Sequence, residues 1–386
     1  MKKQTKILHA ITRLDKGGSA TNTLLSAIGL VKKGYAVDLL YGCTREADEE
    51  LIIRAKKAGV RVFGQNTLVR NIHPVKDLIA FFKIFGFILE GNYDIVHAHS
   101  HKAGLVCRWA AKCAGVKKIV YTPHGHVFYG YFGGALTGLI LLAERITVNI
   151  SDKTVGLTES ECREWVLYGI GKREKYTAIP SGIEFSSLEL ETSSGTSWRE
   201  ELDIPENAIL IGSAGRLIKI KGYKYFIEAA IQQIKKRDNV YFVIAGDGPL
   251  EGDHRRLIAS AGVEDRFFIV PWQKNVGTLI KSLDIFVLSS LNEGMGRVLV
   301  EAMFFGVPVI GTHVSGIPSV IADGAGILIE PASPEGISVA IDAMLDNRAV
   351  MHQMGQRGRA KALAEYSADR MINLLDELYK ELLESE

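Results

Sequence analysis

Short apolar stretches alternate with longer segments of helical spacing along most of the chain. Before residue 190, strand-like runs at 6–11, 36–41, 60–63, 93–97 and 119–122 alternate with helical patterns at 19–34, 46–58 and from Pro74 onward. Apolar runs with few polar interruptions are typical of strands buried on both faces. The alternation therefore predicts a parallel sheet with helices on both sides.

The pattern stops between Ser186 and Pro205, where serine, glycine and threonine dominate and apolar residues are few. Such a stretch is typical of a linker. Strand-like runs then resume at 209–212, 240–245, 267–270, 285–289, 307–310 and 326–329. We therefore expect an α/β protein with two Rossmann-like domains and an interdomain cleft that holds the active site.

The expected boundaries follow from these breaks. Residues 1–190 form the first domain, 191–204 the linker and 205–365 the second domain, and 366–386 form a C-terminal helix. A chain of 386 residues suits two domains. Its composition, 47% apolar and 23% charged, excludes a disordered, collagen-like or disulfide-stapled protein.

The charge is distributed unevenly between the two halves. A net charge of +2 argues against a dedicated nucleic-acid binder. Residues 1–190, however, carry 26 Lys and Arg against 17 Asp and Glu, a net +9, and the remainder carries 20 against 27, a net −7. A basic half and an acidic half suggest different surfaces and different partners.

The cysteines and the apolar runs indicate in which cellular compartment the protein is expected. Cys43, Cys107, Cys113 and Cys162 form no C-x-x-C pair, so neither a zinc site nor a disulfide framework is indicated, and we expect a reducing compartment. The N-terminal residues show no secretory signal. The apolar runs 78–89 and 131–143 are shorter than the about 20 residues that span a bilayer; we interpret them as core helices, with a membrane-lying face as the alternative.

The most specific motif is EGMGRVLVE, from Glu293 to Glu301, which follows a buried strand and opens a helix. Gly294 and Gly296 allow backbone N–H groups to approach a ligand closely, and a helix N-terminus favours a phosphate or a sugar hydroxyl. The two carboxylates, as acceptors only, suit pairs of hydroxyls. The alternative interpretation is a solvated glutamate and an ordinary acidic residue near a helix start.

Two further motifs are less specific. In GRLIKIKG, Arg216 ends a strand and Lys221 precedes a helix, so the two cations match a diphosphate, although they could also be solvated surface residues. Gly17 and Gly18 follow the first strand but do not form a G-x-G-x-x-G fingerprint, which disfavours a dinucleotide cofactor and a dehydrogenase.

Histidines cluster after two strands. His97, His99 and His101 alternate along the chain, and His124 and His126 follow another strand. Alternation would place the first three on one face and could form a metal site. No carboxylate or cysteine completes a ligand set, so a polar wall of the site is the preferred interpretation and no metal is expected.

Together these motifs resemble a retaining glycosyltransferase of family 4 (glycosyltransferase group 1), of the bacterial polysaccharide type and with the GT-B fold. The resemblance covers nearly the whole chain and rests on EGMGRVLVEAM, GRLIKIKG, IAGDGP, IPSGIE and the segment from Gly306 to Pro331. It implies transfer of a sugar from a nucleoside-diphosphate sugar, UDP being favoured, to a hydroxyl of a glycan or a polyprenyl-diphosphate-linked acceptor.

The resemblance also implies roles for individual residues. Glu293 would hold hydroxyls of the donor sugar, and Glu301 would bind the ribose. Arg216 and Lys221 would neutralise the diphosphate, and His124 would lie near the reacting sugar. Further donor contacts would come from Gly17, Gly18, Gly294, Met295, Gly296, Trp272 and Gln273.

The basic first half suggests where the acceptor binds. Lys76, Lys83, Arg108, Lys112, Lys117 and Lys118 lie near the two apolar runs. We expect a cytoplasmic enzyme that associates peripherally with the inner face of the membrane, with a soluble acceptor as the alternative. A non-hydrolysing nucleotide-sugar epimerase and a non-catalytic nucleotide-sugar-binding protein are the competing functions on this fold.

Overall fold

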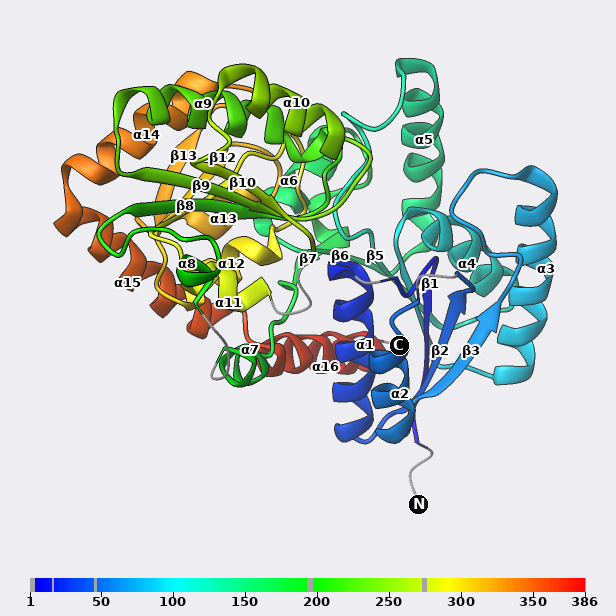
Figure 1. The fold of residues 1–386 in the computed structure, drawn as a ribbon. Coiled ribbons are helices and arrows are strands. Elements are labelled where there is room, and N and C mark those ends of the chain that lie inside the picture. Colours follow the sequence, from blue (N-terminus) through cyan, green and yellow to red (C-terminus); the bar gives the residue numbers. More distant parts are fainter. Residues whose placement is uncertain (1–3, 16, 45–46, 193–196, 273–275, 386) are drawn as a thin grey trace. The chain divides into compact units, whose positions relative to one another are not determined.

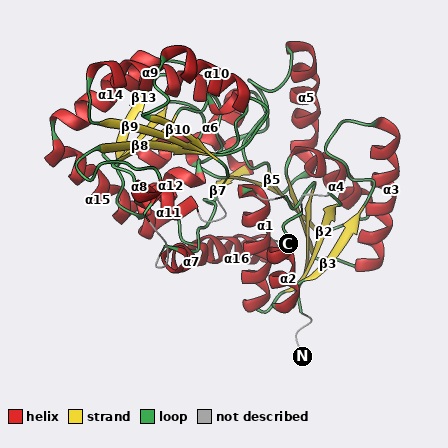
Figure 2. Ribbon diagram, viewed as in Figure 1, coloured by secondary structure: helices red, strands yellow, loops and turns green. Residues whose placement is uncertain are grey.

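The structure is a computed structural model, and it describes residues 4–15, 17–44, 47–192, 197–272 and 276–385. The chain forms two compact units. Unit 1 contains residues 1–182 together with 368–386, and unit 2 contains residues 183–367. In each unit, helices pack on both faces of a sheet, as Figure 2 shows.

The helices and strands of unit 1 alternate along the chain, and the five strands up to residue 122 correspond to the strand-like runs in the sequence. They are β1 (Lys6–Ile11), α1 (Gly18–Lys32), β2 (Ala36–Gly42), α2 (Glu49–Lys57), β3 (Arg61–Gln65), α3 (Pro74–Gly91), β4 (Ile95–His99), α4 (His101–Cys113), β5 (Lys118–Thr122), α5 (Gly134–Thr147), β6 (Lys153–Gly156), α6 (Glu159–Leu167), β7 (Tyr176–Ala178) and α16 (Ala368–Glu384).

The seven described strands of unit 1 form one parallel sheet in the order β3-β2-β1-β4-β5-β6-β7. Residues of α1, α2 and α16 pack on one face of this sheet, and residues of α3, α4 and α6 pack on the other (Figure 1). The order reverses between β1 and β4. A crevice forms at such a switch point, because the connections leave in opposite directions.

The C-terminal helix α16 is part of unit 1, where it packs against α1. Its buried positions, including Met371, Leu375 and Leu382, recur with helical spacing and join the core of that face. The close approach needs a small residue on α1, since a Cβ on Gly29 would lie 2.2 Å from the side chain of Ile372.

Unit 2 repeats the design on a smaller sheet. Its helices and strands are α7 (Phe185–Glu191), α8 (Trp198–Glu201), β8 (Ile209–Ala214), α9 (Tyr223–Lys236), β9 (Val240–Ala245), α10 (Glu251–Ala261), β10 (Phe267–Val270), α11 (Val276–Lys281), β11 (Ile285–Leu288), α12 (Arg297–Phe304), β12 (Val309–Thr312), α13 (Ile317–Ile321), β13 (Gly326–Ile329), α14 (Pro334–Asp346) and α15 (Arg348–Glu365). The parallel strand order is β10-β9-β8-β11-β12-β13, which places the switch point between β8 and β11.

Three details differ from the sequence-based expectations. The stretch expected to be a linker contains α7 and α8, and unit 2 begins at Ile183. The helix expected from residue 46 begins at Glu49, because the Asp48 side chain caps it by accepting the backbone N–H of Leu51 at 3.2 Å. His101 begins α4 and does not extend the strand that carries His97 and His99.

The apolar runs are not simply core helices. Run 78–89 lies in α3 and run 131–143 leads into α5, and both contain large apolar side chains that are exposed. No helix within the described part of the chain is long and apolar enough to cross a membrane.

Candidate active site

The candidate site in unit 2 lies at the switch point of its sheet. Arg216 and Lys221 follow β8, and Glu293 follows β11, the strand next to β8. Because both strands are parallel, their carboxyl ends meet at the same edge, where ligands of such sheets bind. The topology therefore brings together two motifs that are separated by more than 70 residues in the sequence.

Lys221 and Glu293 form an ion pair at this edge. Both side chains are largely shielded from solvent, with exposed fractions of 20% and 18%. Ser290 also donates a hydrogen bond to Glu293 Oε2, at 3.3 Å. The Lys221 backbone is held by the hydroxyl of Ser289, which donates to its carbonyl at 3.1 Å. A cation and a carboxylate thus lie side by side in the segments that follow two neighbouring strands.

Glycines allow the loops around this pair to pack closely. Gly222 has φ of 65°, and a Cβ there would lie 2.1 Å from the carbonyl oxygen of Ser289. The IAGDGP loop lies against the loop after β8 in the same way, because a Cβ on Gly246 would lie 1.9 Å from the carbonyl oxygen of Gly215. These contacts explain why the two motifs are rich in glycine.

The helix α12 begins at Arg297, shortly after Glu293. Gly294, Met295 and Gly296 are buried, and Gly296 caps the helix with φ of 78°. Burial lowers the pKa of Arg297, the first helical residue, and the neighbouring carboxylate of Glu301 acts in the opposite direction. The N-terminal end of a helix supplies backbone N–H groups and a positive dipole end, both of which favour a phosphate.

The remaining expected donor contacts in unit 2 are less enclosed. Arg216 is exposed at the end of β8. Trp272 follows β10 and is 40% exposed, and its backbone N–H donates to Asp247 Oδ1 at 3.2 Å. Gln273 lies outside the described residues.

In unit 1, the expected site residues also lie at the carboxyl edge of the sheet. Gly17 and Gly18 are exposed and start α1, shortly after β1 ends. His124 lies two residues beyond β5, with φ of 59°, a left-handed conformation that is uncommon for a non-glycine residue. Hydrogen bonds hold the next residue on both sides: Gly125 N–H donates to Glu161 at 3.0 Å, and its carbonyl lies 3.1 Å from His101 Nε2.

The histidine cluster differs from the expected one. Within the described part of the chain, the three potential metal ligands that gather are His9, His97 and His99, with ligand atoms within 4.8 Å of one another. His97 already contacts Tyr379 at 2.6 Å and Thr122 at 2.7 Å through its two ring nitrogens. A divalent ion would add buried positive charge with no carboxylate in the group, which is costly. These residues do not fit a metal centre, and the expectation that the enzyme needs none stays a prediction.

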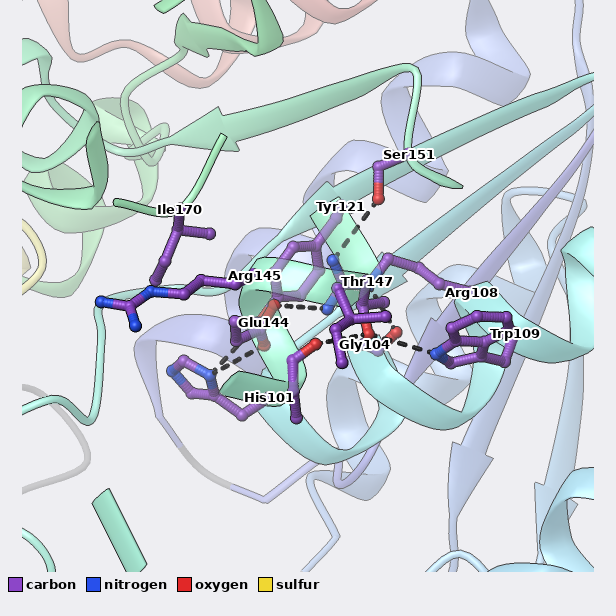
Figure 3. A network of polar contacts seen from close by, with 12 residues as sticks. His101, Gly104, Arg108, Trp109, Tyr121, Glu144, Arg145, Thr147, Ser151 and Ile170 are labelled. Carbon is purple, nitrogen blue, oxygen red and sulfur yellow. Dashed lines mark hydrogen bonds and ion pairs between the residues drawn. The ribbon is translucent and has the colours of Figure 1, made fainter. Parts of the chain in front are cut away.

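A buried polar network lies on the face of the unit 1 sheet that α4 covers (Figure 3). Arg108 is fully buried, so the expectation that it contributes to a basic surface is wrong. Its guanidinium donates to Glu144 of α5 at 2.7 Å and to the Gly104 carbonyl at 2.7 Å, and it lies over the Tyr121 ring at 3.8 Å. The network therefore joins α4 to α5 through an ion pair, and α4 to β5 through the contact with the Tyr121 ring.

Sequence reasoning missed His9 and the part that Ser289 and Ser290 play. His9 lies in the middle of an apolar strand, where a polar residue among buried positions was the available signal. The serines directly follow β11, shortly before the EGMG motif, and only the tertiary structure shows that they support Lys221 and Glu293.

Comparison with known proteins agrees with this arrangement. The family model for Glycosyltransferase Family 4 matches residues 16–187, and the model for Glycosyl transferases group 1 matches residues 195–361. The UDP-Gal:alpha-D-GlcNAc-diphosphoundecaprenol alpha-1,3-galactosyltransferase of Escherichia coli is 27% identical over 329 residues, 84% of each chain. The N-acetyl-alpha-D-glucosaminyl L-malate synthase of Bacillus anthracis is 27% identical over 318 residues, 81% of each chain.

Solved structures share the fold. HepE of Anabaena, in complex with UDP and glucose, has a TM-score of 0.78 at 20% identity and matches 98% of this chain and 100% of its own. Sucrose-phosphate synthase of Thermosynechococcus elongatus has a TM-score of 0.81 at 18% identity and matches all of both chains. These likenesses confirm the predicted fold class, two Rossmann-like α/β domains of the GT-B type.

Proposed function

Because this chain belongs to the family 4, group 1 glycosyltransferases, we propose that it transfers a sugar from UDP to a hydroxyl of a lipid-linked glycan, with retention of anomeric configuration. The family itself establishes glycosyl transfer in polysaccharide or glycoconjugate assembly. The choice of UDP and of a lipid-linked acceptor draws on the Escherichia coli relative, which is named for both.

The observation that carries the proposal is the Lys221–Glu293 pair at the switch point of unit 2. A donor diphosphate competes with Glu293 for the Lys221 ammonium, and the released carboxylate is then available to accept hydrogen bonds from sugar hydroxyls. The ion pair thus keeps both groups in place at the carboxyl edge of the sheet before the donor binds, which limits the reorganisation needed during reaction.

The chemistry follows from where charge develops. As the bond between the sugar and the diphosphate breaks, negative charge grows on the leaving diphosphate. Lys221, Arg216 and the N-terminal end of α12 supply the positive potential that stabilises it. Since these groups already provide cations, we propose that transfer needs no metal, and activity should persist after dialysis against a chelator.

Substitution of the pair tests the assignment. We expect Lys221→Ala and Glu293→Gln each to lower kcat by about 100-fold or more, because each removes a group placed at developing charge or at the sugar. Lys236→Ala is a matched control, since it removes the same charge from a lysine at the exposed end of α9 that pairs with Asp342 of α14. Circular dichroism checks that each variant is folded.

Three results would refute the proposal. Near-wild-type rates in both variants would show that Lys221 and Glu293 take no part in the reaction. Conversion of labelled donor to its epimer without acceptor would replace transfer by epimerisation, and donor binding without turnover on any lipid-linked acceptor would indicate a sensor. A thermal-shift screen of nucleoside-diphosphate sugars, carried out first, identifies the donor for these assays.

We further propose that unit 1 docks on an anionic membrane surface through α3 and α5. On α3, Val75, Leu78, Ile79 and Phe82 are all exposed and recur at positions i, i+3, i+4 and i+7. This spacing places them along one stripe. Such a stripe has no folding role, because the opposite face of the helix, with Ala80, Ile84 and Ile88, already packs in the core.

The helix α5 is apolar on its outer side and polar on its inner side. Leu139, Leu142 and Ile146 are more than half exposed, whereas Glu144 and Thr147 are buried. A helix that only covered a core would show the reverse distribution. The buried network in Figure 3 holds this helix by an ion pair and leaves its apolar side chains free for a partner.

Charge favours a lipid surface as that partner. The α3 and α5 helices both contact α4, which lies between them in the same helical layer (Figure 1). Lys76, Lys83 and Arg145 are exposed on these two helices. Basic residues beside apolar stripes match anionic headgroups above acyl chains, at about 1 kcal/mol for each well-placed cation. A lipid-linked acceptor would meet the enzyme at that surface.

Vesicle co-sedimentation tests the docking. We expect the protein to bind phosphatidylglycerol vesicles at low salt, to bind phosphatidylcholine vesicles weakly, and to lose binding in Phe82→Glu and Leu139→Glu. Val339→Glu is the matched control, since Val339 is an equally exposed apolar residue in unit 2. Absence of binding to anionic vesicles, or equal loss in the control, would contradict the membrane proposal and leave the transferase proposal standing.

A further inference from the structure

Three histidines of unit 1 form a hydrogen-bonded chain that ends at His124. His9 Nδ1 lies 2.8 Å from His99 Nε2, and His99 Nδ1 lies 3.0 Å from His124 Nε2. His9 belongs to β1, His99 is the last residue of β4, and His124 follows β5. The chain therefore runs across three neighbouring strands, from the interior of the sheet to its carboxyl edge.

The inner members of this chain are held neutral. His9 and His99 are buried, and burial lowers the pKa of His9 to about 3 and that of His99 well below its ordinary value. The nearby rings of His97, His9 and His124 lower the pKa of His99 further. A neutral imidazole has one donor nitrogen and one acceptor nitrogen, so each hydrogen bond determines the direction of the next.

The buried end of the chain sets that direction. His9 Nε2 is buried and has no hydrogen-bond partner among the residues that the structure describes. Burying an unpaired N–H group is less tolerated than burying an unpaired acceptor, so the proton of His9 belongs on Nδ1. His9 then donates to His99 Nε2, and His99 in turn donates from Nδ1 to His124 Nε2. The proton of neutral His124 is consequently on Nδ1.

We propose that His9 and His99 are positioning residues that hold His124 in the Nδ1-protonated form, so that it donates a hydrogen bond to an oxygen of the sugar donor and does not act as a base. The proposal rests on the proposed transferase function for the identity of that oxygen. The backbone supports the same role, because Glu161 and His101 both bond to Gly125 and hold His124 in its left-handed conformation.

Nitrogen NMR reads the tautomer directly and does not depend on activity. In protein labelled with ¹⁵N-histidine, we expect His124, assigned by the signals missing in His124→Gln, to show a protonated Nδ1 and an unprotonated Nε2. In His99→Phe the donor to Nε2 is lost, so the two tautomers should mix, and kcat should fall by about 10-fold to 100-fold, as for other residues that orient a functional histidine.

Two further variants separate positioning from stability. In His99→Asn the side-chain amide can replace the Nδ1 donor, so we expect it to restore the His124 spectrum and most of the kcat lost in His99→Phe. Tyr379→Phe is the control, because it removes the hydrogen bond to His97 in the same histidine layer without touching the chain. We expect its His124 signals and kcat to match those of the wild type.

Several outcomes would overturn the proposal. They are a wild-type His124 protonated on Nε2, an unchanged His124 spectrum in His99→Phe, and an equal change in Tyr379→Phe. If His99→Phe does not fold, the wild-type spectrum and the spectrum of His99→Asn still test whether His124 is protonated on Nδ1. If the tautomer is as expected but the wild type transfers no sugar, the chain is correct and only the proposed function fails.

Discussion

Replacing Arg108 by methionine should destabilise unit 1 strongly. The guanidinium is fully buried and pairs with Glu144, which is itself only 4% exposed (Figure 3). Methionine fills much of the space but leaves the Glu144 carboxylate without its cation. An uncompensated buried charge is among the most costly defects in a protein interior, at about 3 to 5 kcal/mol.

The pKa of Glu144 gives an independent magnitude. Burial by itself raises this pKa, but the charge of Arg108 and the hydrogen bonds from His101 and Arg108 outweigh burial and lower the pKa from 4.5 to about 2. At about 1.4 kcal/mol per pKa unit, the ionised carboxylate contributes about 3 kcal/mol to stability. Because the folded pKa is depressed, this contribution is present above pH 4.5 and is lost as the pH falls toward 2.

Hydrogen exchange measured by mass spectrometry provides the assay, since peptides from β4, α4 and β5 report on unit 1 separately from unit 2. We expect Arg108→Met to lower the free energy of opening by about 3 kcal/mol or more at pH 7, and Arg108→Met/Glu144→Leu to recover most of it. Arg173→Met, which breaks an exposed pair with Glu159, should cost less than about 1 kcal/mol. A cost below about 1 kcal/mol for Arg108→Met, or a double variant no better than the single one, would refute the reasoning.

Two other changes have defined outcomes. Gly222→Ala would place a Cβ 2.1 Å from the carbonyl oxygen of Ser289, so the backbone beside the candidate site must shift and sugar transfer should fall at least tenfold in a steady-state assay. Gly262→Ala has nearly the same φ but open space around its Cβ, and should keep its activity; equal losses would contradict the role of the close contact. Acid should destabilise unit 1 through His9, whose pKa falls from 6.5 to about 3 on burial. Below pH 6.5 the unfolded chain binds a proton at His9 that the folded protein does not bind. The free energy of unfolding should therefore fall by up to about 5 kcal/mol between pH 6.5 and 3. In thermal melts, the stability of His9→Phe should fall less steeply with pH than that of the wild type.

Local patterns were sufficient for most of the fold. The strand β11 is buried at every position, so its sequence is a continuous apolar run that is easily recognised. The start of α3 at Pro74 and the glycine before α12 were also readable, because helix termini depend on a few neighbouring residues. The stretch before Pro205 was misjudged, since two short helices with few apolar residues resemble a linker.

The candidate site was predictable only in part. Lys221 and Glu293 stood out because glycines surround them, but nothing local shows that they touch each other. Arg108 was misplaced because a single arginine on a helix has the same sequence signature whether it faces water or a buried glutamate. The exposed stripe of α3 was assigned to the core for a similar reason, since apolar spacing alone does not show what covers it.

The sequence by itself determined the alternation of strands and helices, the division into two sheets, and the residue types available for sugar and phosphate chemistry. These depend on periodicity and turns, which neighbouring residues encode. Only the tertiary structure decided which distant residues meet. The order of strands brought Lys221 to Glu293, and His9 to His99 and His124. Parallel strands are joined by crossover connections, so strands that are neighbours in the sheet can be distant in the sequence, and no local pattern identifies which strands will pair.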